Sequence, residues 1–203
     1  LKVSKVGSEL LNTYLSNLLK RYSMAYVVSI RTFIITMLNY AFKTQIIANK
    51  VMGVTSLKPP KTEITVFTEF EQAELEQYIL FNIDNINIAL LLALHTGIRI
   101  GELCAIKLYD FNLDTGYLNI NKTMQRVKNL EPNASTKTKI IIDSPKSESS
   151  IREIPLPQFL IDILKPVIRT YNKSAFLLTY SIHDFIEPRT LENKYQRILK
   201  KCN

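Results

Sequence analysis

The stretch LLLALHTGIRIGELCAIKLYDF, residues 90–111, carries the strongest structural signal in the chain. It begins inside a longer apolar run, because residues 86–94 are all apolar except Asn87. A helix without a polar face is expected to be buried on all sides. Thr96 and Gly97 end this helix, since glycine suits the left-handed conformation that closes a helix. The stretch therefore predicts a rigid apolar helix immediately before Arg99.

A second helix is predicted just after Arg99. Ile100, Leu103 and Cys104 recur at the spacing of one helix face, and Glu102 lies one turn away from Arg99. A carboxylate at this spacing can hold the guanidinium at the start of the helix. On spacing alone, a weak surface ion pair is the simpler interpretation. The role of Arg99 therefore depends on further evidence.

Three strings of sequence resemble signature motifs of the tyrosine recombinases, the phage and transposon integrase family. Residues 96–103, TGIRIGEL, resemble the first box of the family, TGxRxxEL. Residues 141–147, IIDSPKS, and residues 150–156, SIREIPL, resemble its lysine-bearing β-hairpin, as found in integrases of conjugative transposons and related phages. Two such regions at about the right distance form a fairly specific signal. The resemblance covers nearly the whole chain.

The resemblance implies an enzyme that cuts and rejoins DNA at specific sites through a 3′-phosphotyrosine intermediate, for integration or excision of a mobile element. It implies that Arg99 is the first catalytic arginine, that Glu102 supports it and that Lys146 is the general acid. It implies no metal or cofactor, double-stranded DNA as the partner, and a homotetramer on DNA for the full-length protein. Without the resemblance, Lys146 would be interpreted as a solvated lysine in a turn.

Positive charge is concentrated in the N-terminal part of the chain. The net charge is +8, and residues 1–60 hold eight lysines and arginines against one acid, Glu9, which leaves +7 there and +1 in the rest. Such an excess predicts phosphate binding whose affinity falls with salt. A solvated basic surface without a ligand is the alternative interpretation.

A helix from about Tyr26 is predicted to present its polar side to DNA. Ser29, Arg31 and Lys43 lie on that side and are the predicted contacts. Further DNA contacts are predicted for three basic residues later in the chain, namely Lys139, Arg152 and Arg189. The opposite side of the helix is expected to be consumed by packing and consists of Ile30, Phe33, Ile34, Met37, Leu38, Ala41 and Phe42.

The predicted fold class is mainly α with a small three-stranded antiparallel β-sheet (α+β). Residues 1–57 are interpreted as a helical core DNA-binding domain, residues 58–62 as a linker stiffened by Pro59 and Pro60, and residues 63–203 as the start of a catalytic domain. Strands are predicted from Tyr117, over residues 139–143 and over residues 151–156. A polar insertion is predicted at residues 126–138. Later helices are predicted over residues 160–171 and around residues 191–199.

Composition excludes several classes of protein. Two cysteines, Cys104 and Cys202, and two histidines indicate neither a disulfide framework nor a zinc site. The longest apolar run, residues 88–94, is far shorter than the roughly 20 residues that cross a bilayer, and no charged-then-apolar leader opens the chain. A cytoplasmic protein is therefore expected.

The nucleophile of the family is not recognisable in this chain. The family places its tyrosine after an HxxR box, but neither His95 nor His183 has an arginine three positions later. Among the ten tyrosines, Tyr195 shares a helical spacing with Leu191 and Ile198, which indicates a core position. We therefore expect the catalytic domain to lack its C-terminal part. The resemblance to the family also implies that the first domain lacks its first helices. The chain is then expected to be inactive alone.

Two other functional classes remain to be distinguished. A non-catalytic DNA-binding or architectural protein would need only the basic N-terminal part, and its activity would not depend on Arg99. A metal-dependent nuclease or transposase would need clustered carboxylates to hold two ions. Asp110, Asp114 and Asp143 do not follow such a pattern.

Overall fold

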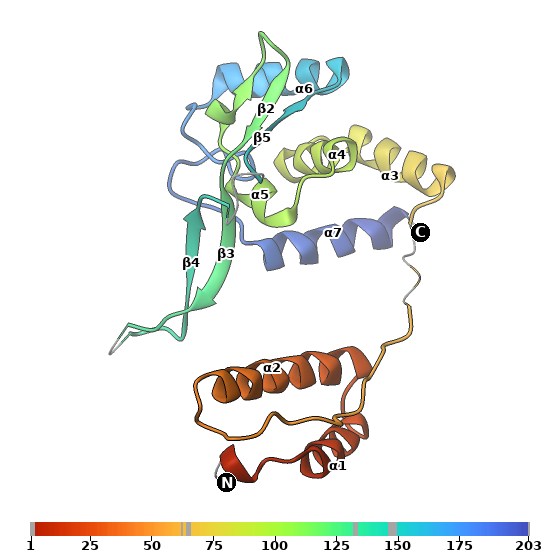
Figure 1. Cartoon of the computed structure of the whole chain (residues 1–203). Helices are drawn as coiled ribbons and strands as arrows, with labels where there is room; N and C mark the ends of the chain where they lie inside the picture. The colour runs from red at the N-terminus through yellow and green to blue at the C-terminus, as the bar shows by residue number, and fades with distance from the viewer. Residues whose placement is uncertain (1–2, 62, 64–65, 132–133, 146–149, 203) are drawn as a thin grey trace. The chain divides into compact units, whose positions relative to one another are not determined.

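The computed structural model describes residues 3–61, 63, 66–131, 134–145 and 150–202. The chain divides into two compact units, Leu1–Thr65 and Val66–Asn203, which Figure 1 colours from red at the N-terminus to blue at the C-terminus. Each unit has its own hydrophobic core. They are named the first unit and the second unit below.

The first unit contains two α-helices and an extended segment that follows them. A short 3-10 helix, η1 (Val3–Lys5), precedes α1 (Ser8–Leu19) and α2 (Met24–Lys43). Ser23 caps α2, because its hydroxyl oxygen accepts a hydrogen bond from the backbone N–H of Tyr26 at 3.4 Å. The small core of this unit consists of Leu11, Leu38, Ala41 and Ile47.

The apolar face of α2 is buried only in part, which corrects our expectation. Leu38 and Ala41 are buried as predicted, together with Val27. Phe33 and Met37, however, are 66% and 57% exposed. Within this unit, α1 and the segment after α2 pack against one side of the helix only. The helix therefore carries a second apolar side that the unit leaves exposed.

By length and composition, α2 is also the one described helix that could cross a membrane. Arg31 and Asn39 interrupt its apolar run, so our criterion of run length did not single it out. Core helices of soluble proteins also meet this criterion, which makes it a weak indication. Only 17% of the most apolar window of the helix is buried. This agrees with the exposed apolar side chains of α2 described above.

The second unit begins with two packed helices, α3 (Glu69–Phe81) and α4 (Asn85–Thr96). Thr68 and Glu71 form a reciprocal cap at the start of α3. The Thr68 hydroxyl accepts from the N–H of Glu71 at 3.2 Å, and the Glu71 carboxylate accepts from the N–H of Thr68 at 2.8 Å. Residues 86–92 of α4 are all buried, so the prediction of a helix buried on all sides is confirmed. It lies in the middle of the unit, against α3, α5 (Ile100–Ala105) and α6 (Gln158–Thr170) (Figure 1).

The strands of the second unit form two small sheets. After the 3-10 helix η2 (Leu108–Asp110), strands β1 (Phe111–Asn112), β2 (Tyr117–Ile120) and β5 (Arg152–Pro155) form an antiparallel sheet in the order β1-β2-β5. Strands β3 (Thr123–Lys128) and β4 (Thr138–Asp143) form a long antiparallel hairpin (Figure 1). The predicted fold class, mainly α with a three-stranded antiparallel sheet, is confirmed.

Two details of the strand prediction were wrong. Residues 126–128 belong to β3, so this part of the expected insertion is a strand. Residues 139–143 pair with β3 in the hairpin and do not join the three-stranded sheet. The sequence signal was weak because Met124 is the only residue of β3 that is buried. One inward-facing apolar side chain gives no alternation from which a strand can be recognised.

The last helix, α7 (Pro188–Cys202), packs against α5 and α3, whereas α6 covers α4. The core of the unit joins the apolar side chains of α4 to Leu118 and Ile120 of β2 and to Leu160 and Leu164 of α6. This core fixes the junction between α4 and α5, where Arg99 lies.

Candidate active site

Arg99 stands between the buried helix α4 and the short helix α5. Gly97 adopts a left-handed conformation with φ 63°, and its N–H donates to the carbonyl of Ala93, which closes α4. The backbone N–H of Arg99 donates to Oε2 of Glu102 at 3.0 Å and so begins α5. The side chain of Arg99 is 70% exposed. A guanidinium is thus presented at the surface from a rigid backbone.

Glu102 is a buried carboxylate that two arginines share. Its side chain is 3% exposed. Nη1 of Arg99 donates to Oε1 at 2.8 Å. Arg152, at the start of β5, donates from Nη1 to Oε1 at 3.1 Å and from Nη2 to Oε2 at 2.9 Å. The three side chains together carry a net charge of +1, so the cluster is suited to attract an anion.

The pKa of Glu102 reflects these contacts. Burial raises the pKa of its carboxyl group, but hydrogen bonds from Arg152 and Arg99, together with the charge of Arg152, lower it to about 2. The same hydrogen bond raises the pKa of Arg152. The carboxylate is therefore ionised at every pH at which the protein would work.

Gly101 allows the hairpin to lie directly against α5. A Cβ atom at this position would be 2.7 Å from Oγ1 of Thr123 and 2.8 Å from the backbone oxygen of Met124. Both distances are too short for a side chain without a shift of β3. Sequence reasoning missed this requirement, because the box TGxRxxEL leaves the position of Gly101 open.

Two further ion pairs fix the strands in this region and were not predicted. Nζ of Lys122 lies 2.9 Å and 3.0 Å from the two carboxylate oxygens of buried Asp110. Arg126 of β3 donates two hydrogen bonds to Glu187, just before α7, at 2.8 Å and 2.5 Å. The paired residues are 12 and 61 positions apart. No local pattern in the sequence could have revealed them.

Three predicted site residues of the second unit are not part of the Arg99 cluster as described. Lys146 lies outside the described residues. Nζ of Lys139 pairs with Glu131 at 2.5 Å, and Nη1 of Arg189 pairs with Glu192 at 2.7 Å. Both pairs are at the surface, where the side chains of Lys139 and Arg189 are 43% and 76% exposed. Arg152, predicted as a DNA contact, forms an ion pair with buried Glu102.

The three predicted DNA contacts of the first unit differ in their surroundings. The hydroxyl of Ser29 donates to the backbone carbonyl one turn earlier in α2 at 3.1 Å. Arg31 donates to the carbonyls of Thr55 and Val54 at 2.7 Å and 3.1 Å, and so ties the extended segment to the helix. Lys43 is exposed in the last turn of α2, and within the described residues it has neither a hydrogen bond nor an ion pair.

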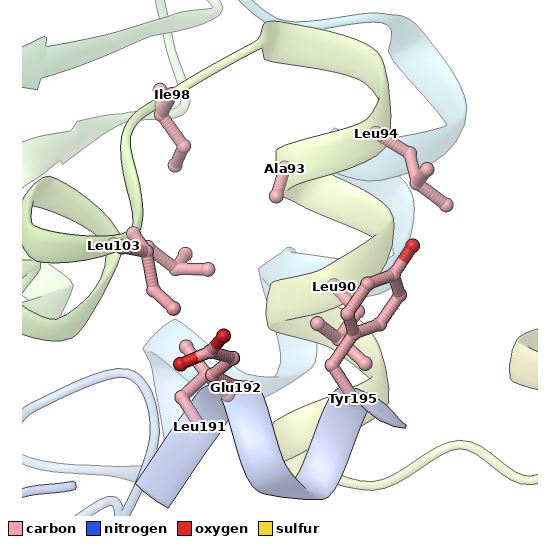
Figure 2. A pocket seen from close by; sticks show the side chains of 9 residues that line it. Leu90, Ala93, Leu94, Ile98, Leu103, Leu191, Glu192 and Tyr195 are labelled. Carbon is pink, nitrogen blue, oxygen red and sulfur yellow. The ribbon is translucent and has the colours of Figure 1, made fainter. Parts of the chain in front are cut away.

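An apolar pocket of about 230 Å³ lies between α4, α5 and α7 (Figure 2). Leu90, Ala93 and Leu94 of α4 face Leu191 and Tyr195 of α7 across it, as Figure 2 shows. Tyr195 packs against the core, as its spacing indicated, and burial raises the pKa of its hydroxyl. The described residues hold no group of three or more His, Cys, Asp or Glu side chains that could bind a metal ion.

The chain is similar to known recombinases in sequence and in fold. No family model matches the chain. A tyrosine recombinase XerC-like protein of Caldanaerobacter subterraneus subsp. tengcongensis is 27% identical over 224 residues, which cover 100% of this chain and 57% of the relative. The Tn1549 transposon integrase in complex with a circular intermediate DNA superposes with a TM-score of 0.76 at 17% identity, over 98% of this chain and 65% of that one.

A lambda integrase tetramer bound to a Holliday junction has the same fold, with a TM-score of 0.62 at 16% identity, over 98% of this chain and 54% of that one. The chain thus spans between about half and two thirds of the length of these proteins. The similarity to solved structures establishes the fold, and the similarity in sequence relates the chain to a XerC-like recombinase. The chain is similar in sequence to a XerC-like tyrosine recombinase and has the fold of the Tn1549 and lambda integrases.

Proposed function

We propose that this chain is part of a tyrosine-type site-specific recombinase, which cuts and rejoins DNA through a 3′-phosphotyrosine intermediate to integrate or excise a mobile element. The observation that carries the proposal is the exposed guanidinium of Arg99, fixed by the buried carboxylate of Glu102. Homology to a XerC-like recombinase supports site-specific recombination in general. Because the chain spans 57% of that relative, the activity is proposed for the complete protein.

The chemistry of strand exchange fits a fixed arginine. Transfer at a phosphodiester passes through a crowded state with extra negative charge on its non-bridging oxygens. The planar fork of arginine can donate two parallel hydrogen bonds to such oxygens, which lysine cannot do. Arg99 is proposed as this donor, Glu102 as its support, and Lys146 as the acid that protonates the leaving 5′ oxygen. The last assignment rests on the resemblance of residues 141–156 alone.

Double-stranded DNA is the proposed partner. The first unit is the proposed core-binding domain, since residues 1–60 carry +7 of the net charge of +8. Residues 58–62 are the proposed linker and residues 63–203 the proposed start of the catalytic domain, acting in the cytoplasm. By analogy with the lambda integrase tetramer on a Holliday junction, a homotetramer on DNA is proposed for the complete protein.

The experiment that tests this proposal uses the complete protein and a nicked DNA substrate that traps the covalent intermediate. Arg99→Lys keeps the charge but loses the fork, so we expect trapped product to form a hundredfold more slowly or worse, by analogy with the loss of one oxyanion donor. Binding of the DNA should stay nearly unchanged. Arg169→Lys, which makes the same exchange at an exposed arginine of α6, is the matched control.

The alternative is a non-catalytic DNA-binding protein. In that case the wild-type complete protein would bind DNA but yield no covalent adduct, and Arg99→Lys would change nothing. A cleavage reaction that requires Mg²⁺ would instead indicate a metal-dependent nuclease.

A further inference from the structure

Arg152 makes a bidentate interaction with the carboxylate of Glu102. Nη1 and Nη2 each donate to a different oxygen of the carboxylate, at 3.1 Å and 2.9 Å. A two-armed bond of this kind fixes the plane of a carboxylate as well as its position. Nη1 of Arg152 also donates to the carbonyl of Ser150 at 3.2 Å, so its guanidinium is also bonded to the backbone just before β5.

The oxygens that Arg152 orients are the same ones that hold Arg99. Oε1 of Glu102 accepts from Nη1 of Arg99 at 2.8 Å, and Oε2 accepts from the backbone N–H of Arg99 at 3.0 Å. The backbone and the side chain of Arg99 therefore both depend on the rotation of one carboxylate. Among the residues that the structure describes, Arg99 would be the one remaining partner of that carboxylate without Arg152, and Arg99 is the group that the carboxylate has to position.

Exposure distinguishes the two arginines. The side chain of Arg99 is 70% exposed, whereas that of Arg152 is 32% exposed. Among the described residues, Glu102 is the only partner of the Arg99 guanidinium, so its outer edge can meet a phosphate. Both arms of Arg152 point inward to Glu102. A guanidinium directed at a buried carboxylate is better suited to positioning that carboxylate than to contacting DNA.

We infer that Arg152 is a positioning residue, which sets the orientation of Arg99 through the carboxylate they share. The inference deepens the proposed recombinase function and rests on it for its catalytic consequence. It replaces the interpretation of Arg152 as a DNA contact. Arg152 acts through Glu102 and does not touch the scissile phosphate.

The first arm of the test needs no activity. In the 203-residue chain, hydrogen exchange of the Arg99 amide reports on its bond to Glu102. Arg152→Ala and Arg152→Lys should both accelerate this exchange, the alanine variant more. The amide of Leu118, in the sheet next to β5, serves as the reference for intact folding. Unchanged exchange of the Arg99 amide in a folded Arg152→Ala chain would overturn the inference.

The second arm measures cleavage and DNA affinity separately in the complete protein. Arg152→Ala should lower the single-turnover cleavage rate by about a hundredfold, the effect expected when a reacting group shifts by about 1 Å. The Kd for DNA and its dependence on salt should stay as in wild type. A direct phosphate contact would instead weaken binding and reduce the salt slope by about one, and that outcome would also overturn the inference.

A double-mutant cycle tests whether the effect of Arg152 on cleavage is transmitted through Glu102. In a Glu102→Gln background, adding Arg152→Ala should lower cleavage no further, because the carboxylate through which Arg152 acts is already gone. Additive losses would contradict the inference. Glu102→Gln with Arg152→Ala also removes the buried unpaired charge, which keeps a folded variant available if Arg152→Ala alone unfolds.

The exchange measurement and the cleavage measurement together distinguish failure of the positioning role from failure of the recombinase function. If wild-type protein cleaves DNA and Arg152→Ala cleaves equally well, the positioning role fails while the recombinase function stands. If wild-type protein forms no adduct but Arg152→Ala still accelerates exchange of the Arg99 amide, the positioning role stands and the recombinase function fails.

Discussion

A methyl group on Gly101 would meet two atoms of β3 at once. We expect Gly101→Ala to lower the free energy of unfolding of the second unit by about 1–3 kcal/mol, the usual cost of adding a carbon to a filled space. The backbone oxygen of Met124, at 2.8 Å from the added carbon, cannot move without shifting the strand. Urea unfolding followed by circular dichroism would measure the change.

Thr123 offers a matched control for this change. Its Oγ1 is the other close atom, at 2.7 Å. Combining Gly101→Ala with Thr123→Ala should recover part of the lost stability, since the hydroxyl clash is relieved while the clash with the Met124 backbone remains. Full stability in Gly101→Ala alone would mean that β3 and α5 are not held this close.

Glu102 should make the second unit sensitive to acid. Its folded-state pKa of about 2 lies below the ordinary value of 4.5. A lowered pKa stabilises the folded state above pH 4.5, and this contribution is lost as the pH falls from 4.5 towards 2. The loss in the free energy of unfolding should reach at most about 3.5 kcal/mol, because a difference of one in pKa corresponds to about 1.4 kcal/mol.

Thermal melting between pH 5 and pH 2 would test this contribution. Glu102→Gln should be less stable than wild type at pH 5, and the difference should shrink as the pH falls. A difference that stays constant over this range would show that the ionised carboxylate does not stabilise the fold.

Sequence reasoning at this scale succeeded where the relevant residues are neighbours. Arg99 and Glu102 are three positions apart, and their bond follows from helical spacing together with the resemblance. Arg152 was recognised as a candidate, but its partner lies 50 positions away. Only the pairing of β2 with β5 brings the two together. The direction in which a side chain points across such a distance could not be deduced from spacing.

Among the elements, the β3-β4 hairpin packs against α5 and is also linked to the segment before α7 by Arg126. Its guanidinium joins Thr138 on β4, at 2.7 Å, to Glu187 before α7. We expect Arg126→Ala to accelerate amide hydrogen exchange in residues 123–128 and 138–143. Global stability should fall by at most about 1 kcal/mol, because the arginine side chain is 47% exposed.

Arg189→Ala is the matched control for the hairpin. It removes an arginine whose ion pair with Glu192 lies within α7, three residues apart. Exchange in the hairpin should therefore stay as in wild type. Equal acceleration in both variants would show that loss of charge, and not loss of the Glu187 contact, loosens the hairpin.

The elements themselves were predictable to different degrees. The continuous apolar run of α4 is a local signal, and it was recognised from the sequence. The hairpin was only half recognised, because β3 buries one residue and mixes polar and apolar side chains. The exposed apolar side of α2 could not be foreseen, since periodicity identifies apolar residues but not which of them a neighbour covers.

At the scale of the whole molecule, we expect the 203-residue chain to bind DNA without cutting it. Affinity should fall steeply as salt rises, because residues 1–60 carry a net charge of +7. Lys43→Ala should weaken binding. Arg31→Ala should weaken it as well, but by loosening residues 54 and 55, to which Arg31 is bonded. Filter binding at several salt concentrations would measure each effect.

No covalent DNA adduct should form with this chain, because no tyrosine in it follows an HxxR box. Denaturing gel electrophoresis after incubation with a nicked substrate would test this. An adduct on any tyrosine of the chain would contradict the interpretation that none of its tyrosines is the nucleophile. Binding that does not respond to salt would contradict the electrostatic role of the first unit.

The shared carboxylate also has a consequence for synthesis on the ribosome. Arg152 follows Glu102 by 50 residues, which take roughly 3–10 s to translate at 5–20 residues per second. Throughout that interval a nascent chain holds Glu102 with at most one of its two arginines. A carboxylate in that state resists burial, so α5 should dock firmly only after β5 has emerged and paired with β2. Arg99 would then reach its final place only after β5 has emerged, long after Arg99 itself has been synthesised.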